Sequence, residues 1–399
     1  MRILFISPKI PIPPNDGHKI SIYGVIKHLN LRGHKIDFAG YSQGLTQDEY
    51  LTELKNICMP YIVNYRAKNN LVKEVINCFD SVPYNVSKYR TIKMKRLILD
   101  LLMKRKYDII HVTNIHMAWV VGVVRRVTDT PVVLRQENLE MMIMKRFYGY
   151  QRNPFIKLFT YFQYRKFVKY EPRMCKKFDS CVMMSRNEEE SLLKYDSTIH
   201  TAHIPIGVET KLLSVKSTQK EKFSIVHIGN LSWYPNCDGL NWFLKEIFPE
   251  VVKQQPDTRL YIYSSRIPIS LRISPHLLKN ITQAGYVEDI WNEIKNKSLA
   301  VIPLRIGSGI RVKILEMLAA GINILTTTIG KEGLEVESGK QILIADRKEE
   351  FVQTILNFFE EKYDSSEMVN KGKELIREKY TWGRVADEFE MLYKKIARN

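Results

Sequence analysis

The chain has 399 residues, of which 45% are hydrophobic and 26% charged, and it carries a formal net charge of +18. At about 100–200 residues per domain, this length predicts two domains, and the hydrophobic content suffices for two cores. No segment approaches the roughly 18 unbroken apolar residues of a membrane span, which predicts a soluble or peripheral protein.

The start of the chain and its cysteines both favour a cytoplasmic protein. Residues 2–7 read RILFIS, a strand pattern, where a secretory signal would have a basic and then an apolar segment. The five cysteines are scattered and form no C-x-x-C pair, which argues against a disulfide framework and a zinc site. We therefore expect reduced thiols.

Short apolar runs alternate with helical patterns in two successive series. The first series is RILFIS (2–7), KIDFAGY (35–41), YDIIHVT (107–113), PVVLRQ (131–136) and DSCVMMS (179–185). The second is FSIVHIGNLS (223–232), RLYIYSS (259–265), LAVIPLR (299–305), INILTTT (322–328) and QILIAD (341–346). This alternation is typical of parallel sheets with crossover helices, so it predicts two tandem α/β domains.

A polar stretch at 214–222 lies between the two series, and a helical apolar pattern closes the chain. The expected divisions are a first domain at 1–210, a linker at 211–222, a second domain at 223–380, and a C-terminal helix at 381–399 that packs back toward the first domain. A ligand is expected beyond the carboxyl ends of the strands.

The segment PLRIGSGIRVKILEMLAAG, residues 303–321, predicts a strand, a glycine loop and a helix that ends at Gly321. Glycines let the backbone approach a phosphate, and the free N–H groups of a helix start favour an anion. Lys313 and Glu316 share one face of this helix, where they could face a ligand or simply form a surface ion pair.

Six segments share a recognisable pattern. They are PPNDGHKISIYGVIKHLNLRGH (13–34), LRQENLE (134–140), IPIGVE (204–209), HIGNLSWYPNCDGLNWF (227–243), GYVEDI (285–290) and the segment at 303–321. Together they resemble the family 4 (group 1) glycosyltransferases of GT-B fold, in which two Rossmann-like domains face a central cleft. The resemblance spans nearly the whole chain. It implies a retaining, metal-independent hexosyltransferase that takes a UDP- or GDP-sugar as its donor substrate and has no cofactor.

The resemblance also implies roles for single residues. Glu316 aligns with the glutamate that binds the nucleotide ribose, and Arg311 and Lys313 are placed to neutralise the departing pyrophosphate. The expected donor-binding set is Gly17, Asn230, Gly307, Ser308, Gly309, Arg311, Lys313 and Glu316, and the expected catalytic set is Glu137, Arg311 and Lys313.

Three departures from the family pattern accompany this assignment. Ser308 stands where many members have a first glutamate, and Asn230 stands near the place of an Arg/Lys pair. Glu137 precedes Asn138 where relatives often have a histidine. A carboxylate can take the proton of the acceptor hydroxyl. The alternative is that Glu137 forms an ion pair with Arg135 or Lys145 at the domain surface.

The positive charge is concentrated in the first half of the chain, which has a net charge of +15 against +3 for residues 201–399. Residues 146–178 combine nine Lys and Arg, one acidic residue and eleven aromatics. An anionic membrane surface, a lipid-linked acceptor, or solvated lysines over core aromatics would each explain this stretch. Nucleic acid is not expected, because no nucleic-acid module is present.

The expected function is glycosyl transfer to a glycan or lipid-linked acceptor in cell-surface polysaccharide synthesis, in the cytoplasm or at the inner face of the membrane. The loss of the first glutamate leaves an alternative, a weakly active glycosyltransferase-like subunit that stabilises a partner. A nicotinamide-dependent oxidoreductase is disfavoured, because no G-x-G-x-x-G follows the first strand.

Overall fold

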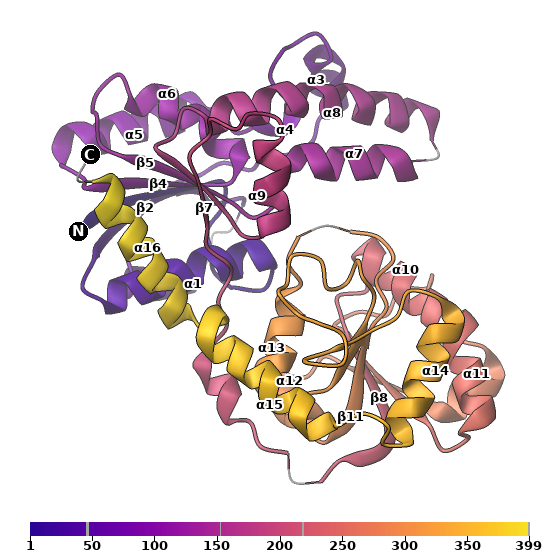
Figure 1. Cartoon of the computed structure of the whole chain (residues 1–399). Coiled ribbons are helices and arrows are strands. Elements are labelled where there is room, and N and C mark those ends of the chain that lie inside the picture. Colours follow the sequence, from indigo (N-terminus) through magenta and orange to yellow (C-terminus); the bar gives the residue numbers. More distant parts are fainter. Residues whose placement is uncertain (45–47, 152, 218, 308, 398–399) are drawn as a thin grey trace. The chain divides into compact units, whose positions relative to one another are not determined.

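The computed structural model describes residues 1–44, 48–151, 153–217, 219–307 and 309–397 (Figure 1). The chain divides into one unit of Met1–Gly207 with Trp382–Asn399, and a second of Val208–Thr381. Residues 211–222, expected as a linker, lie in the second unit. There, Thr210–Ser214 (η2) forms a 3-10 helix, and strand β8 already begins at Glu221. Both units are α/β, as the two series of apolar runs predict.

A seven-stranded parallel sheet of order β3-β2-β1-β4-β5-β6-β7 forms the first unit. Its strands are β1 (Arg2–Ser7), β2 (Lys35–Tyr41), β3 (Met59–Val63), β4 (Ile109–Thr113), β5 (Val132–Gln136), β6 (Ser180–Met183) and β7 (Thr201–His203). Strands β1 to β3 extend to one side and β4 to β7 to the other. The boundary between β1 and β4 is therefore a topological switch point, where open α/β sheets bind ligands.

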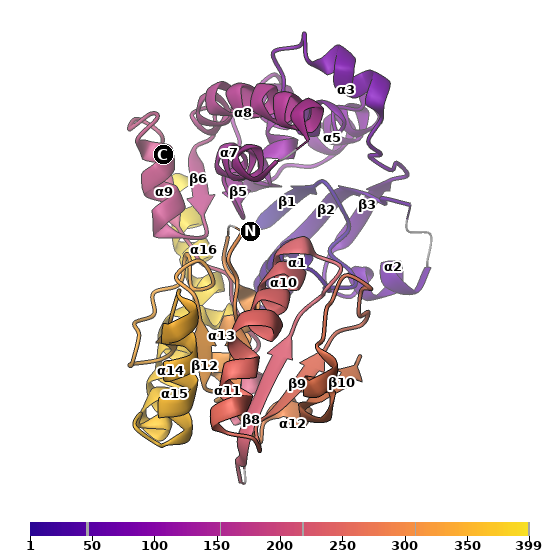
Figure 2. The ribbon, with the colours of Figure 1, turned by 90° about the vertical axis from the view of Figure 1, so that its right-hand side faces the viewer.

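Helices cover both faces of this sheet. They are α1 (Gly17–Leu31), α2 (Asp48–Lys55), α3 (Leu71–Asn77), α4 (Tyr84–Ser87), α5 (Ile92–Lys104), η1 (Ile115–Val120), α6 (Val121–Val124), α7 (Glu140–Tyr150), α8 (Pro154–Cys175), α9 (Arg186–Leu193) and α16 (Trp382–Ile396). Figures 1 and 2 show α1 and α16 on one face, and α5, α7 and α8 on the other. The apolar run of β1 is buried between these layers.

The second unit has a six-stranded parallel sheet of order β10-β9-β8-β11-β12-β13. Its strands are β8 (Glu221–Ile228), β9 (Arg259–Tyr263), β10 (Ile281–Gly285), β11 (Lys297–Ile302), β12 (Ile324–Thr326) and β13 (Leu343–Ile344). Its helices are α10 (Tyr234–Trp242), η3 (Phe243–Ile247), α11 (Phe248–Gln254), η4 (Pro275–Asn280), α12 (Ile290–Ile294), α13 (Val312–Ala320), α14 (Lys348–Phe359), α15 (Ser365–Leu375) and η5 (Ile376–Tyr380). The switch point of this sheet lies between β8 and β11.

Helix α16, although last in the sequence, is part of the first unit. Arg32 and Asp387 form an ion pair of 2.7 Å, and the Tyr393 hydroxyl lies 2.5 Å from Nδ1 of the buried His111 on β4. Trp382 begins α16 and packs against Gly24 of α1, where an added Cβ would lie 2.2 Å from the indole. The absence of a side chain at Gly24 lets the two helices approach.

We expect Gly24→Ala to destabilise the protein, although alanine normally stabilises a helix interior by about 1 kcal/mol relative to glycine. The indole is a rigid ring in a packed site, and overpacking of this kind costs typically 1–3 kcal/mol or more. Denaturant unfolding measures the difference. Gly149→Ala on α7 is the control, because its Cβ would meet no atom within 4 Å. Equal stability of the two variants would contradict the packing described for Trp382.

Candidate functional site

The predicted donor residues of the second unit flank its switch point. Strand β8 ends at Ile228 and leads directly into Gly229 and Asn230, and β11 ends at Ile302 and leads into residues 303–309. These two connections are neighbours because β8 and β11 pair in the sheet. Such a position at the carboxyl ends of parallel strands is where this architecture places a ligand.

The loop after β11 needs glycine at two positions. Gly307 has a φ of +134° and Gly309 a φ of +82°, backbone conformations that other residues rarely adopt. A Cβ on Gly307 would also lie 2.8 Å from Nη2 of Arg311. Ser308, between them, lies outside the described residues. Gly307 and Gly309 therefore give the loop backbone conformations that a residue with a side chain would adopt only with strain.

Arg311 ties this loop to the helix that follows it. It is the N-cap residue of α13 and is only 9% exposed, and its Nη1 donates a hydrogen bond to the Gly309 carbonyl. At the start of the loop, a Cβ on Gly239 of α10 would lie 2.4 Å from the Pro303 carbonyl oxygen. The loop is thus held from both sides, and Arg311 brings its positive charge to the start of a helix.

Lys313 and Glu316 occupy the less buried side of α13, whereas Ile314, Leu315 and Leu318 are buried. The helix ends at Gly321, whose φ of +72° forms a left-handed cap. The spacing in the sequence predicts this division of the helix. Lys313 lies in the first turn, close to the glycine loop, and Glu316 lies one turn further along.

Burial raises the pKa of Glu316 to about 7, an effect that the charge of Lys313 only partly offsets. Burial likewise lowers the pKa of Lys313, against the attraction of Glu316. Neither charge is fully compensated by its neighbour. A buried carboxylate in this state gains from any ligand that donates hydrogen bonds to it, as a pair of ribose hydroxyls would.

His227 of β8 is a further buried polar group beside these residues. Its Nδ1 lies 3.0 Å from the Val301 carbonyl oxygen. Burial, with a contribution from the Lys313 charge, lowers the pKa of His227 to about 4. The ring is therefore neutral at physiological pH, and Nδ1 is the donor to the carbonyl. A Cβ on Gly229 would lie 3.2 Å from Nε2, so the ring lies directly under the turn that carries Asn230.

Asn230 itself is exposed and shapes the turn. Its side-chain oxygen accepts from the Ser232 N–H at 3.0 Å, and its carbonyl accepts from Asn236 at 3.0 Å. Trp233, 46% exposed, follows the turn and would lie 3.8 Å from a Cβ on Gly307. The turn after β8 and the glycine loop after β11 therefore meet at this indole, which offers a flat apolar face beside the loop.

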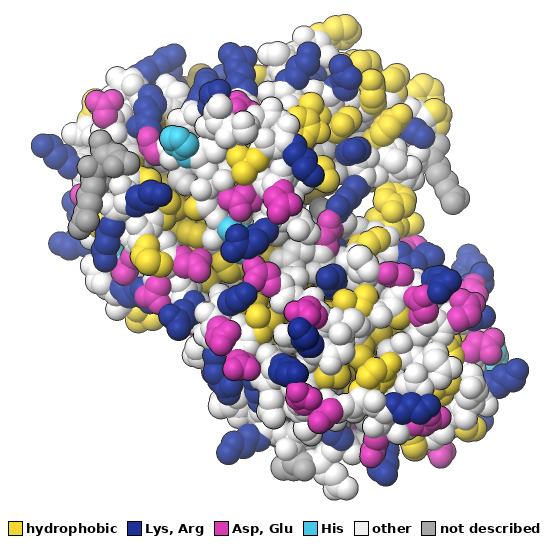
Figure 3. Space-filling model, in the orientation of Figure 1, with side chains coloured by type: hydrophobic (Ala, Val, Ile, Leu, Met, Phe, Trp, Pro, Cys, Tyr) yellow, Lys and Arg dark blue, Asp and Glu magenta, His cyan; other side chains and the backbone are white. Residues whose placement is uncertain are grey.

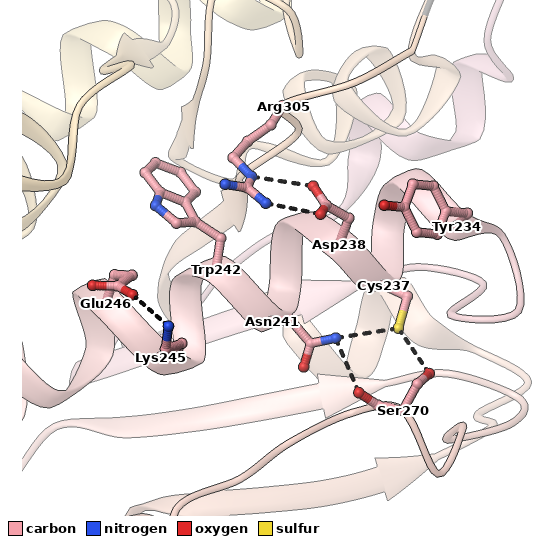
Figure 4. Close-up of a pocket in the computed structure, with 9 residues that line it drawn as sticks. All are labelled: Tyr234, Cys237, Asp238, Asn241, Trp242, Lys245, Glu246, Ser270 and Arg305. Carbon is pink, nitrogen blue, oxygen red and sulfur yellow. Dashed lines mark hydrogen bonds and ion pairs between the residues drawn. The ribbon is translucent and has the colours of Figure 1, made fainter. Parts of the chain in front are cut away.

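A separate pocket of about 330 Å³ lies along α10 (Figure 4). Arg305 forms two bonds to Asp238, of 2.8 and 3.1 Å, and Asn241 donates to the Ser270 carbonyl at 3.2 Å. These polar groups satisfy one another, which leaves little for a ligand to bind. Of the loop after β11, Arg305 lines this pocket, whereas Gly307, Gly309 and the α13 residues are not among its lining residues.

In the first unit, Glu137 directly follows β5 at the carboxyl edge of the sheet. It is buried, and its Oε2 lies 2.8 Å from Nδ1 of His18 and 3.3 Å from the Asn114 amide, which directly follows β4. His18 comes directly after Gly17, the exposed first residue of α1. The predicted residues Gly17 and Glu137 are therefore connected through His18, beside the switch point of this sheet.

The surroundings of Glu137 favour its ionised form. Burial alone would raise the pKa of Glu137, but His18, Arg135 and Asn114 outweigh it and hold that pKa below its ordinary value. An ionised carboxylate only accepts hydrogen bonds, so Nδ1 of His18 donates to Glu137. Nε2 of His18 is buried and has no hydrogen-bond partner among the described residues. Glu137 therefore orients the His18 ring, as the carboxylate of a catalytic triad orients its histidine.

Glu137→Gln and His18→Ala are expected to slow sugar transfer by on the order of 10²-fold, the lower end for loss of general acid–base catalysis. Nucleotide affinity should fall much less than the rate, because all the predicted donor residues except Gly17 belong to the second unit. Glu390→Gln is the matched control, since it alters a similar pair, with Glu390 Oε1 2.7 Å from His34 Nε2, at the other end of α1. Steady-state kinetics and calorimetry check both quantities. Unchanged kcat in both first-unit variants would exclude the pair from the reaction.

Sequence reasoning did not single out His18, Trp233 or His227. His18 directly follows Gly17, which the family resemblance indicated, and Trp233 lies within the segment 227–243 that carries the resemblance. A single histidine or tryptophan, however, has no characteristic spacing in the sequence.

Among the described residues, no group of three His, Cys, Asp or Glu side chains could hold a metal ion, and the helices are too short or too polar to span a membrane.

Two family models match this chain over adjacent regions. The model described as Glycosyltransferase Family 4 matches residues 15–212, and the model described as Glycosyl transferases group 1 matches residues 222–361. Together they match most of both units, including the segments that follow β4, β5, β8 and β11. The chain belongs to the group 1 (family 4) glycosyltransferases.

Similar proteins support the same fold. An uncharacterized 44.6 kDa protein in the cps region of Klebsiella pneumoniae is 21% identical over 404 residues, which span 99% of each chain. Sucrose-phosphate synthase of Thermosynechococcus elongatus has a TM-score of 0.70 at 14% identity, over 99% of both chains. HepE of Anabaena, solved in complex with UDP, has a TM-score of 0.68 at 11% identity, over 99% of this chain and 100% of that one. The two parallel-sheet units are those of a GT-B glycosyltransferase.

Proposed function

We propose that this protein transfers a hexose from a UDP- or GDP-sugar to a glycan or lipid-linked acceptor, with retention of the anomeric configuration and without a metal ion. The observation that carries the donor assignment is the glycine loop, closed by Arg311 and followed on α13 by the partly buried Lys313 and Glu316. Glu316 accepts hydrogen bonds from both ribose hydroxyls, and the glycine loop and the start of α13 hold the diphosphate.

The reaction needs positive charge where the pyrophosphate leaves, and Arg311 and Lys313 supply it. In the first unit, His18, oriented by Glu137, accepts the proton of the acceptor hydroxyl. The match to a protein of the cps region supports a role in cell-surface polysaccharide synthesis, and the complexes of HepE with UDP and UDP-glucose support a nucleotide-sugar donor.

A panel of UDP- and GDP-sugars tests the donor assignment. A donor that binds only the folded protein raises its melting temperature, and slow hydrolysis of that donor without acceptor would follow. One nucleotide should stabilise the protein clearly more than its neighbours in the panel. No shift with any UDP- or GDP-sugar would contradict the proposal.

The second candidate function is a weakly active subunit that stabilises a partner, which is favoured by Ser308 at the position of the first family glutamate. Donor binding without measurable hydrolysis or transfer would support it. The variant Ser308→Glu then distinguishes a transferase from a partner-stabilising subunit. Restored turnover would show that the residue at position 308 had limited the rate of an otherwise intact active site.

A further inference from the structure

Half of the exposed large hydrophobic side chains of the described residues lie on one end of the first unit. They are Leu71, Val72, Val75, Ile76 and Phe79 on and after α3, Phe147 and Tyr150 on α7, and Phe155, Ile156, Leu158, Tyr161 and Phe162 on α8. We call this set the α3–α8 surface. Figure 3 shows hydrophobic side chains gathered at this end of the unit, with Lys and Arg among them.

Helix α3 exposes its apolar side chains to solvent and buries a polar one. Its one buried residue is the polar Asn77, whereas Leu71 is 81% exposed and the following Phe79 is 91% exposed. Asn77 holds the helix to α8, because its side-chain oxygen accepts from the Gln163 amide at 3.1 Å. Polar contacts thus fix the helix with its apolar side outward, where solvent exposure is unfavourable unless something covers it.

Helices α7 and α8 continue this surface and make it basic. Residues 141–170 contain seven Lys and Arg and no Asp or Glu. The Lys157 ammonium lies 5.3 Å from the centre of the Tyr148 ring, and the rings of Tyr148 and Tyr161 are 5.5 Å apart. Phe155, 82% exposed, stands at the start of α8. Large apolar side chains therefore project from a positively charged surround.

We propose that the α3–α8 surface docks on an anionic lipid bilayer, with the apolar side chains of α3 and of the start of α8 inserted among the acyl chains and the basic residues at the headgroups. This combination of apolar insertion and positive charge binds the interface of anionic membranes. A second copy of the chain is disfavoured as the occupant, because a symmetric contact would bring the basic stretch of 141–170 against its own copy.

The proposed docking does not depend on the proposed sugar transfer. The contacts of the lysines show which of them are available to bind lipid headgroups. The ammonium of Lys166 donates to the Asn77 carbonyl, and Lys176 pairs with Asp196 at 3.1 Å. These two lysines already have partners inside the unit. Lys73 on α3 and Lys157 on α8 stand among the apolar residues and are the better candidates for headgroup contacts.

Sedimentation of the full chain with vesicles tests the proposal. Vesicles of phosphatidylcholine with about a third phosphatidylglycerol should bind the wild type, and vesicles of phosphatidylcholine alone should bind it less. The variant Leu71→Ser, Ile76→Ser, Phe79→Ser should lose on the order of tenfold in partitioning for each inserted side chain, at fixed salt. Its melting temperature should match the wild type, because these side chains contact mainly solvent.

The control variant Leu31→Ser, Ile269→Ser, Met391→Ser removes side chains that are 71%, 104% and 63% exposed on other elements. It should bind vesicles like the wild type. Equal binding by both triple variants, or no binding of the wild type to anionic vesicles at low salt, would overturn the proposal. So would a wild-type dimer that ignores vesicles and dissociates in the α3 variant, because a second copy would then be the occupant.

Discussion

Glu316→Ala is expected to lower the affinity of the protein for its nucleotide sugar by on the order of 2–3 kcal/mol, or roughly 30- to 150-fold. The physical reason is that one partly buried carboxylate accepts hydrogen bonds from two ribose hydroxyls, and hydrogen bonds to charged groups are the stronger kind. Calorimetric titration measures the loss. An affinity equal to that of the parent would remove Glu316 from the nucleotide site.

The raised pKa of Glu316 adds a pH dependence to this prediction. Only the ionised carboxylate can accept from both hydroxyls, so affinity should be constant well above pH 7 and fall about tenfold per unit below it. A nucleotide sugar such as UDP-glucose suits the titration, because its diphosphate does not titrate in this range. In Glu316→Gln the affinity should be low and independent of pH.

The raised pKa of Glu316 also predicts how the stability of the unliganded protein depends on pH. Affinity for the nucleotide should fall at low pH, whereas stability should fall at high pH. Burial raises the pKa of Glu316 from its ordinary value of 4.5 to about 7, so folding favours the protonated form. That contribution is complete below pH 4.5 and is lost as pH rises through about 7. Glu316→Gln cannot ionise, so above pH 7 the unliganded variant should be more stable than the parent, by on the order of 1–3 kcal/mol. Equal unfolding free energies at pH 8 would show that the carboxylate is well solvated.

Arg311→Ala combined with Lys313→Ala is expected to reduce the rate of sugar transfer by on the order of 10²–10³-fold or more, the loss that follows removal of one preorganised donor. The two cations interact with charge that grows on the leaving pyrophosphate, so turnover should fall more than nucleoside binding. Arg311 also bonds to the Gly309 carbonyl, so its single variant should loosen the glycine loop as well.

Single-turnover kinetics and nucleoside binding separate these effects. Lys348→Ala is the control, because Lys348 is a surface cation of the same unit whose Nζ lies 3.6 Å from Glu250. It should transfer sugar at the parent rate. A double variant that transfers sugar as fast as the parent would mean that other groups stabilise the leaving diphosphate.

Much of the fold could be predicted from the sequence, because buried parallel strands have an unmistakable apolar run. The runs 2–7 and 35–41 coincide with observed strands, and the run 223–232 overlaps β8. The linker was harder to place, because a polar stretch can be the solvent-exposed start of a strand. Glu221 illustrates this, since it begins β8 and pairs with Lys297.

The second-unit site could be predicted in outline because its residues are contiguous, and helical spacing places Lys313 and Glu316 on one face. The hydrogen-bond partner of Glu137 could not be predicted from the sequence. Arg135 and Lys145 are its neighbours along the chain, but the partner found is His18, which the sheet brings near from more than a hundred residues away. The exposure of the apolar side chains of α3 could not be predicted either, because apolar side chains are ordinarily expected to be buried.

A crystal structure of the protein with its best-binding nucleotide sugar would locate the donor site. We expect the ribose hydroxyls to lie within hydrogen-bond distance of the Glu316 carboxylate. We expect the diphosphate at the loop of Gly307 and Gly309, facing the start of α13. A nucleotide seated elsewhere, for example in the pocket along α10, with no contact to Glu316, would contradict this expectation.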